Sequence, residues 1–456
     1  MPVHSSPCGR FLILATLAGG FVMAMIDVTA VNVALSDIAR DLAIPLTGLV
    51  WVVDGYTLTF AALLLAGGAL ADRYGPKAVY QGGLLVFMVG SVLCGAAPDG
   101  AFLTAARLLQ GAGAALFMPS SLSLLTHSFD DAHERTRMLG VWSALVGVAG
   151  ASGPLIGGLL VHQFGWRSVF WVNVPLGVLA VVLAQLALRA PARQPRELSL
   201  LSHALGVAAL AGVSFVLIEA PVLGWLSVPV VAAGALAVAS ASLLLRRERR
   251  GSHPLLPRAL FQSSSFGAAN GVGFLINFCV FGQLFLLSLF LQQADGADAL
   301  RAGLLLLPMM AAYTVGNFLA GAIAARHGTR KPMLLGLLTA SVMALLLMGL
   351  RPATPYAWLA LVTGVMNLAI GIAIPAMTAT VMRVAGKQHA NSAAAALNAN
   401  RQIGALVGVA LVGSILHLTP SWAGRMPLAY AIMALAYGLA ACLVYRHVRL
   451  ARAQAA

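Results

Sequence analysis

Long apolar runs recur along the whole chain and restrict its fold more than any other feature. Each run is about as long as the 20 residues that cross a bilayer as a helix. Of the 456 residues, 60% are hydrophobic and only 9% are charged, whereas a soluble domain carries about 25% charged residues. A soluble fold of this length cannot bury so much apolar surface. Because a helix satisfies its own backbone hydrogen bonds in lipid, we predict an all-α polytopic membrane protein whose surroundings are the lipid bilayer.

Fourteen apolar runs can be counted, and we expect each to be a transmembrane helix. The first run is too long for the core of a cleaved signal peptide, and it contains Asp27. The predicted spans are Phe11–Leu35, Leu49–Leu70, Val79–Ala97, Ala101–Leu125, Met138–Val161, Ser168–Leu188, Leu200–Glu219, Leu226–Leu245, Phe266–Leu291, Ala302–Ala325, Met333–Leu350, Tyr356–Met382, Arg401–His417 and Leu428–Tyr445.

The positive charges are distributed unevenly over the connections. With the N-terminus inside, the cytoplasmic segments hold 21 of the 28 Lys and Arg residues, and the opposite side holds 5. This is the positive-inside bias of membrane proteins. It predicts a multi-pass protein of the cell inner (cytoplasmic) membrane with both termini in the cytoplasm. It also accounts for the net charge of +14, so we expect no nucleic-acid partner.

An internal repeat suggests how the spans are grouped. Gly68–Lys77 follows the second span, and Gly321–Lys331 follows the tenth with the same order of Gly, Arg, Gly and a cation. The central glycines, Gly75 and Gly328, are 253 residues apart, which fits six spans plus an inserted pair. Parallel six-helix repeats are one architecture of secondary transporters.

The two most polar connections, Arg189–Glu197 and Arg246–Gln262, bracket two spans and leave six spans on either side. We therefore predict two six-helix bundles plus two extra central helices. The expected boundaries are 1–188 for the N-terminal bundle, 189–262 for a linker with two additional helices, and 263–456 for the C-terminal bundle.

Three carboxylates fall within apolar runs: Asp27, Asp54 and Glu219. A charge at membrane depth is costly unless it is paired, hydrated or protonated, so we consider all three as sites for proton coupling or substrate. Asp27 is the deepest of them. Other interpretations stay open: Asp27 could be a structural residue, Asp54 could lie near the outer headgroups, and Glu219 could lie at the outer interface.

Arg107 lies six residues into the fourth span and does not readily lose its proton. It therefore needs a counter-charge or backbone acceptors, and we expect it to assist a buried carboxylate. The alternative is that it snorkels to the outer surface. Gln110 follows it one turn later, and Gly111 and Gly113 would let neighbouring helices approach closely.

Two glycine motifs are candidates for conformational change. The fifth span contains Gly-Pro followed by Gly-Gly, which predicts a kinked face that packs closely on a partner helix. The loop motif Gly68–Lys77 could hold the inward side of the protein closed by a charge relay between neighbouring helices, or it could simply anchor the topology. The residues considered for gating are Gly68, Asp72, Arg73, Gly75, Lys77, Gly153, Pro154, Gly157, Gly158 and Arg326.

Motifs of enzymes are missing from the sequence. It has no Gly-rich phosphate loop ending in Gly-Lys-Ser/Thr, no His-Glu-x-x-His and no Gly-x-Ser-x-Gly. The ten His residues have no ligand spacing. We therefore expect no catalytic residues, no metal site and no resident cofactor.

Five motifs, in order along the chain, resemble those of the major facilitator superfamily. They are Ile26 to Leu35, Gly68 to Lys77, Arg107 to Gly113, Gly153 to Gly158 and Trp166 to Gly177. The first and the last resemble elements of its drug:proton antiporter family with fourteen transmembrane helices (EmrB/QacA type). The resemblance covers nearly the whole chain. It implies two bundles around a central cavity that rock between inward-open and outward-open states.

By this resemblance the chain would be a proton-coupled secondary active transporter that exports lipophilic drugs or small metabolites by alternating access. The resemblance implies that Asp27 is a proton or cation site, that Arg107 assists proton transfer, and that the proton gradient supplies the energy. Spans nine to fourteen have no carboxylate, unlike in some family members, so we expect neutral or singly charged substrates. Candidates to line the substrate cavity are Asn32, Gln110, Asn270, Asn277, Gln283 and Asn317.

Two other functions compete with drug export. The chain could export or flip a specific lipid or biosynthetic product on the same fold. It could also be a membrane enzyme or receptor, although the missing catalytic motifs and short loops argue against that. The sequence leaves open the need for a periplasmic adaptor.

Overall fold

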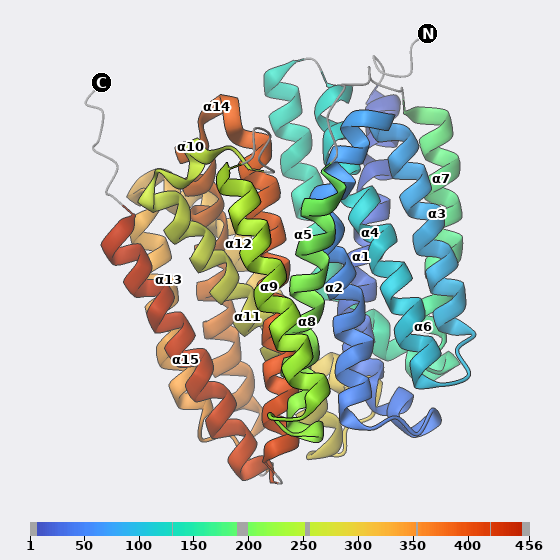
Figure 1. The fold of residues 1–456 in the computed structure, drawn as a ribbon, viewed down its shortest axis with the longest axis vertical. Coiled ribbons are helices and arrows are strands. Elements are labelled where there is room, and N and C mark those ends of the chain that lie inside the picture. The colour runs from blue at the N-terminus through green and yellow to red at the C-terminus, as the bar shows by residue number, and fades with distance from the viewer. Residues whose placement is uncertain are drawn as a thin grey trace. The chain divides into compact units, whose positions relative to one another are not determined.

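A computed structural model of the chain describes residues 7–129, 131–188, 199–250, 256–352, 354–419 and 421–448. These residues form helices and contain no strand (Figure 1). The helices are α1 (Pro7–Asp41), α2 (Leu46–Tyr74), α3 (Pro76–Gly95), α4 (Gly100–Ser128), α5 (Ala132–Phe164), α6 (Ser168–Trp171), α7 (Asn173–Ala187), α8 (Leu200–Leu223), α9 (Val228–Arg250), α10 (Arg258–Phe261), α11 (Ser264–Gln293), α12 (Ala299–His327), α13 (Arg330–Leu347), α14 (Tyr356–Leu418) and α15 (Trp422–His447).

Within the described ranges, 14 helical segments are long and apolar enough to cross a membrane, which confirms the predicted count. Helices α6 and α7 together make one span, and α10 is too short to be one. Helix α14 contains two spans, because Gly386 interrupts it with a φ of 63° and a ψ of −178°. The break separates Tyr356–Gly386 from Ser392–Leu418.

One predicted boundary is wrong in a way that matters for the chemistry. The thirteenth span begins at Ser392, so Arg401 lies well inside it and not at its start. The apolar pattern is weak here because Asn398 and Asn400 interrupt a run of alanines. Alanine contributes little hydropathy, but it is the best helix former, and the helix therefore continues through this stretch.

Contacts divide the chain into two compact units. The first contains Met1–Phe215, Val231–Leu244 and Ala297–Leu304, and the second contains Val216–Val230, Leu245–Gly296 and Leu305–Ala456. In the first, α4 packs on α2 and α3, and α1 packs on α5. In the second, α11 packs on α14, while α13 packs on α14 and α15.

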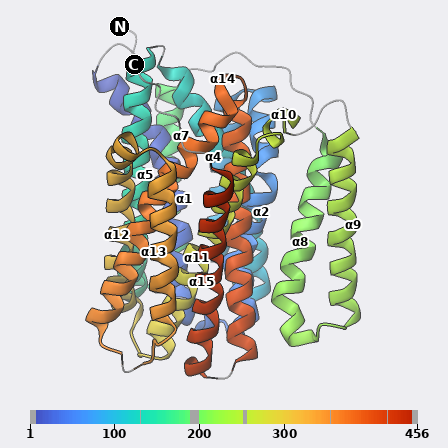
Figure 2. The same cartoon turned by 90° about the vertical axis from the view of Figure 1, so that its left-hand side faces the viewer.

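The extra pair of helices, α8 and α9, forms an antiparallel hairpin (Figure 2). It is closely packed at Gly212, where an added Cβ would lie 2.6 Å from the carbonyl oxygen of Ala233. The predicted connection Arg189–Glu197 before this hairpin lies outside the described residues. The proposed limits 1–188, 189–262 and 263–456 stay a prediction.

The sequence repeat has a structural counterpart in each unit. Gly75 turns the chain between α2 and α3 with a φ of 95°, and Gly328 turns it between α12 and α13 with a φ of 71°. Two residues further on, Lys77 donates to the carbonyl oxygen of Leu188 at 2.8 Å. Arg330 donates to that of Tyr445 at 2.7 Å. Each cation thus satisfies a carbonyl group at a helix C-terminus, α7 in one case and α15 in the other.

The turn at Gly75 gives a stability prediction. Gly75→Ala should lower the unfolding temperature of the purified protein, because a side chain at a positive φ costs about 1–3 kcal/mol. Gly68→Ala is the matched control within the same motif. No atom lies within 4 Å of a Cβ added at Gly68, and alanine favours a helix over glycine by about 1 kcal/mol. Scanning fluorimetry in detergent measures both variants, and an equal unfolding temperature for the two would contradict this account of the turn.

Candidate functional site

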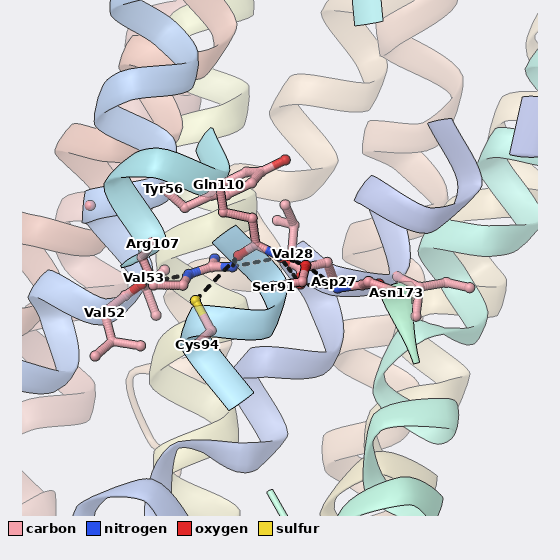
Figure 3. Close-up of polar contacts among 12 residues, drawn as sticks. Asp27, Val28, Val52, Val53, Tyr56, Ser91, Cys94, Arg107, Gln110 and Asn173 are labelled. Carbon is pink, nitrogen blue, oxygen red and sulfur yellow. Dashed lines mark hydrogen bonds and ion pairs between the residues drawn. The ribbon is translucent and has the colours of Figure 1, made fainter. Parts of the chain in front are cut away.

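The centre of the site is Asp27, which lies near the middle of the span Phe11–Asp41. Its side chain is 0% exposed, and Arg107 on α4 is 1% exposed. Arg107 Nη1 lies 2.6 Å from Asp27 Oδ2, so the two form a buried ion pair (Figure 3). Arg107 therefore lies in the interior, and the alternative that it snorkels to the outer surface is wrong. Its charge is compensated in the interior, as a guanidinium at this depth requires.

Arg107 has further partners that hold its plane in place. Its Nε donates to the carbonyl oxygen of Val52 on α2 at 3.0 Å. Its Nη1 also donates to Gln110 Oε1 at 2.5 Å. The ring of Tyr56 lies beneath the guanidinium, with 4.5 Å between Arg107 Cζ and the ring centroid. These contacts combine hydrogen bonds with a cation–π interaction, and they fix one orientation of the arginine.

The second carboxylate oxygen of Asp27 accepts two amide hydrogen bonds. Gln110 Nε2 donates to Asp27 Oδ1 at 2.9 Å, and Asn173 Nδ2 donates to it at 2.8 Å. Both amides also donate to Ser91 Oγ, at 2.7 and 3.2 Å. Gln110 lies on the same face of α4 as Arg107, three residues further on. The carboxylate therefore joins α1 to α4 and α7, and the two amides extend the cluster to Ser91 on α3 (Figure 3).

The glycine motif of α5 packs on α1 immediately after Asp27. A Cβ added at Gly153 would lie 2.9 Å from Thr29 Cβ, and one added at Gly157 would lie 2.6 Å from Ala30 Cβ. A Cβ at Gly158 would lie 2.5 Å from the carbonyl oxygen of Ala299, which belongs to the same unit. Pro154 lies inside α5 between these contacts. The motif thus brings α5 directly against the helix that carries the carboxylate.

Asp54 on α2 differs from Asp27 in the hydrogen-bond partners of its carboxylate. It is also 0% exposed, but neither of its carboxylate oxygens has a hydrogen-bond partner among the described residues. It follows Val52, whose carbonyl oxygen binds Arg107. An ionised carboxylate without partners in a dry interior is very costly. This environment is compatible with the neutral, protonated form of Asp54.

Several predicted site residues lie outside this cluster. Glu219 is half-buried on α8 near its end and belongs to the second unit. Asp72 is half-buried at the end of α2, whereas Arg73 and Arg326 are exposed. Their predicted roles in coupling and gating stay predictions.

The polar candidates for the substrate cavity mostly donate to their own helices. Their side-chain amides reach the carbonyl oxygen four residues earlier, at 2.9 to 3.0 Å, in Asn32, Asn270, Asn277 and Asn317. Asn367, not predicted for this cavity, does the same and also reaches Gln283 Oε1 at 3.3 Å. Gln110 instead belongs to the Asp27 cluster. The six predicted candidates are thus divided between different places in the two units.

The second unit contains a cavity of about 530 Å³ between α11 and α14. Its lining is mostly apolar, and Asn270 and Asn400 contribute polar groups. Asn400 Nδ2 donates to the carbonyl oxygen of Asn270 at 2.6 Å, so the two helices are joined here. A volume of this size is typical of pockets for small organic ligands.

Ser91 and Asn173 belong to the site, although sequence reasoning did not select them. Asn173 offered a signal, because it lies in the apolar segment Trp166–Gly177 that carried part of the family resemblance. Ser91 offered none, since serine is common in spanning helices and can satisfy itself on its own backbone. Ser91 lies beside the amides of Gln110 and Asn173 only because α3, α4 and α7 pack together in the fold.

Comparison with known proteins gives consistent results. The sequence profile described as Major Facilitator Superfamily matches residues 17–409. A methylenomycin A resistance protein of Bacillus subtilis is 50% identical over 435 residues, which is 95% of this chain and 93% of the relative. A protein of the same name in Streptomyces coelicolor is 46% identical over 95% of this chain and 91% of its own length.

More distant relatives and a solved structure agree on the fold. The multidrug resistance protein Stp of Mycobacterium tuberculosis is 34% identical over 89% of this chain and 76% of its own length. A bacterial homologue of the human lysosomal transporter Spinster, solved in an inward-facing and unoccupied conformation, superposes with a TM-score of 0.66 at 17% identity, covering 97% of both chains.

These matches confirm the predicted major facilitator fold and the prediction that the chain is not an enzyme. They cover all the helices that build the Asp27 cluster and most of the second unit. With fourteen apolar helices, this chain belongs to the major facilitator superfamily of membrane transporters.

Proposed function

We propose that this transporter exports small lipophilic antibiotics or related metabolites in exchange for protons. It would lie in the cytoplasmic membrane with both termini inside, and the proton gradient would be its only energy source, without a resident cofactor. The names of relatives at 46% and 50% identity support an antibiotic as substrate, since both are methylenomycin A resistance proteins. The multidrug name of a relative at 34% identity supports export as the common activity.

The observation that carries proton coupling is the contrast between two buried carboxylates. Asp27 has an arginine partner at 2.6 Å and two amide donors, so its oxygens are fully engaged by the cluster. Asp54 is equally buried, but its oxygens have no partner among the described residues, which favours the protonated form. We therefore assign the mobile proton to Asp54, and to Asp27 the task of holding Arg107.

In this scheme Asp54 receives a proton when α2 is accessible from outside and releases it when the site opens inward. Arg107 links α1 to α2, because its Nη1 binds Asp27 while its Nε binds the carbonyl oxygen of Val52 on α2. A movement of α2 that accompanies proton release would therefore be transmitted to the Asp27 cluster. Close packing of Gly153 and Gly157 on α1 would extend that movement to α5.

The identity of the substrate can be tested by the growth of bacteria that express the chain. Expression of the chain in an efflux-deficient host should raise the inhibitory concentration of methylenomycin A, and a protonophore should abolish the effect. The Asp54→Asn variant, which should fold normally but lose gradient-driven transport, is the control for transport activity. If the chain confers no resistance but moves labelled lipid between leaflets of reconstituted vesicles, the alternative of a lipid exporter replaces this proposal.

Asp54→Asn tests the proton carrier. The amide resembles a protonated carboxyl group, so the variant should fold with an unchanged unfolding temperature. In proteoliposomes it should still exchange labelled substrate against unlabelled substrate, but a pH gradient should no longer drive accumulation. Gradient-driven transport at the wild-type level would exclude Asp54 as the carrier.

Asp27→Asn should behave differently because it leaves a buried arginine without its counter-charge. Breaking a buried ion pair from one side costs about 3–5 kcal/mol, so yield and unfolding temperature should fall together with transport. The double variant Asp27→Asn/Arg107→Gln should recover part of the stability but no transport. A single variant as stable as the wild type would contradict the assigned role of the ion pair.

A further inference from the structure

The cavity of about 530 Å³ in the second unit has a wall of unusual uniformity. Its lining residues are apolar or glycine, with two exceptions, Asn270 on α11 and Asn400 on α14. None of the described residues that line it is ionisable. A charged ligand would lose part of its hydration here without gaining a counter-charge. The cavity is therefore suited to an uncharged molecule with a large apolar part.

The two amides have a fixed orientation, because each donates to a main-chain carbonyl group. Asn270 Nδ2 donates to the carbonyl oxygen of Phe266 at 3.0 Å, and Asn400 Nδ2 donates to that of Asn270 at 2.6 Å. A carbonyl oxygen only accepts hydrogen bonds, so the nitrogen of each amide must face it and Oδ1 points away from it. No hydrogen bond among the described residues ends on either Oδ1 atom. The polar groups that remain for a ligand are thus mainly acceptors.

Close packing beside the cavity holds its two walls in place. A Cβ added at Gly404 would collide with the backbone of Phe274, which is a lining residue, and one added at Gly273 would lie 2.9 Å from Leu397 Cδ1. At Gly267, which also lines the cavity, an added Cβ would have no atom within 4 Å. Helices α11 and α14 therefore leave open space next to a tight contact, and the cavity is pre-formed, as ligand sites usually are.

From this arrangement we infer that the cavity binds uncharged lipophilic molecules that donate a hydrogen bond to Oδ1 of Asn270 or Asn400. The matching groups are a hydroxyl, an amide N–H or an undissociated carboxyl group. The apolar part of the molecule lies against Phe266, Phe274 and Leu275. A molecule without a donor covers the Oδ1 atoms and leaves them unsatisfied, which weakens its binding. This inference rests on the proposed export function and narrows its substrates.

Two probes of nearly equal shape test the inference by binding to the purified transporter in detergent at neutral pH. They are 2-naphthol, which donates a hydrogen bond, and 2-methoxynaphthalene, which does not. The wild type should bind 2-naphthol roughly three- to tenfold more tightly, the effect of one neutral hydrogen bond. Asn270→Leu should reduce this preference, and the double variant Asn270→Leu/Asn400→Leu should abolish it. Equilibrium dialysis measures both dissociation constants.

A control variant separates recognition from the loss of a helix hydrogen bond. Thr378→Val removes a half-buried side chain of α14 whose hydroxyl donates to the carbonyl oxygen of Ile374, four residues earlier, at 3.1 Å. Thr378 does not line the cavity, so this variant should keep the preference for 2-naphthol.

A steric variant tests the place of binding and does not depend on the asparagines. Gly267→Leu puts a side chain into the open space of the cavity wall, so it should weaken binding of both probes to a similar extent. Gly364→Leu is its matched control on α14, because a Cβ added at Gly364 also has no atom within 4 Å and this residue does not line the cavity. It should bind both probes as the wild type does.

A wild type that binds the two probes equally overturns the inference. Binding of 2-naphthol that is unchanged in Gly267→Leu also overturns it, because the probe then binds elsewhere. Failure of the proposed function appears separately, as a lack of proton-dependent resistance in cells. A transporter that confers resistance but binds the two probes equally refutes only the role of the cavity.

Discussion

The fold of the first unit depends on how a full positive charge is accommodated in the middle of a bilayer. Arg107 is 1% exposed and cannot shed its proton. Its charge is tolerated because Asp27 lies at 2.6 Å and because the remaining donors find Val52 and Gln110. Such a pair contributes little net stability, but removing one partner is strongly destabilising. It therefore acts as a constraint that α1, α2 and α4 must satisfy together.

That constraint also explains why the neighbouring positions are small or polar. Gly111 faces the backbone of Tyr56 on α2, and Gly113 faces that of Phe87 on α3, so a Cβ at either position would collide with backbone. Ser91 and Asn173 supply the remaining polar partners from α3 and α7. The helices approach closely enough for short polar side chains to reach one carboxylate, which excludes water and preserves the strength of the ion pair.

The helix count and the two buried charges could be predicted from the sequence, because a bilayer requires apolar helices of a set length and makes unpaired charges costly. The length of the apolar runs gave the number of helices, and the costly charges Asp27 and Arg107 were selected because each needs a partner. Interactions within the site were harder to predict. Nothing in the sequence distinguishes Ser91 from other helix serines. Periodicity also cannot tell that the Asp54 oxygens have no hydrogen-bond partner among the described residues, whereas Asp27 has three partners. The start of the thirteenth span was missed because alanines with interspersed asparagines form a helix without a strong apolar signal.

The two halves solve the problem of buried charge in different ways, although they share the glycine turn and the cation that caps a helix end. The first half pairs its deep arginine with an internal acid. The second half has a half-buried arginine, Arg401, within the span Ser392–Leu418, and no acid in helices α11 to α15. A fully buried charge such as Arg107 needs a fixed internal partner, whereas a half-buried arginine can keep its charged end solvated while its stem packs against apolar groups. The shared turns therefore preserve the architecture of the repeat, while the buried ion pair is a property of the first half.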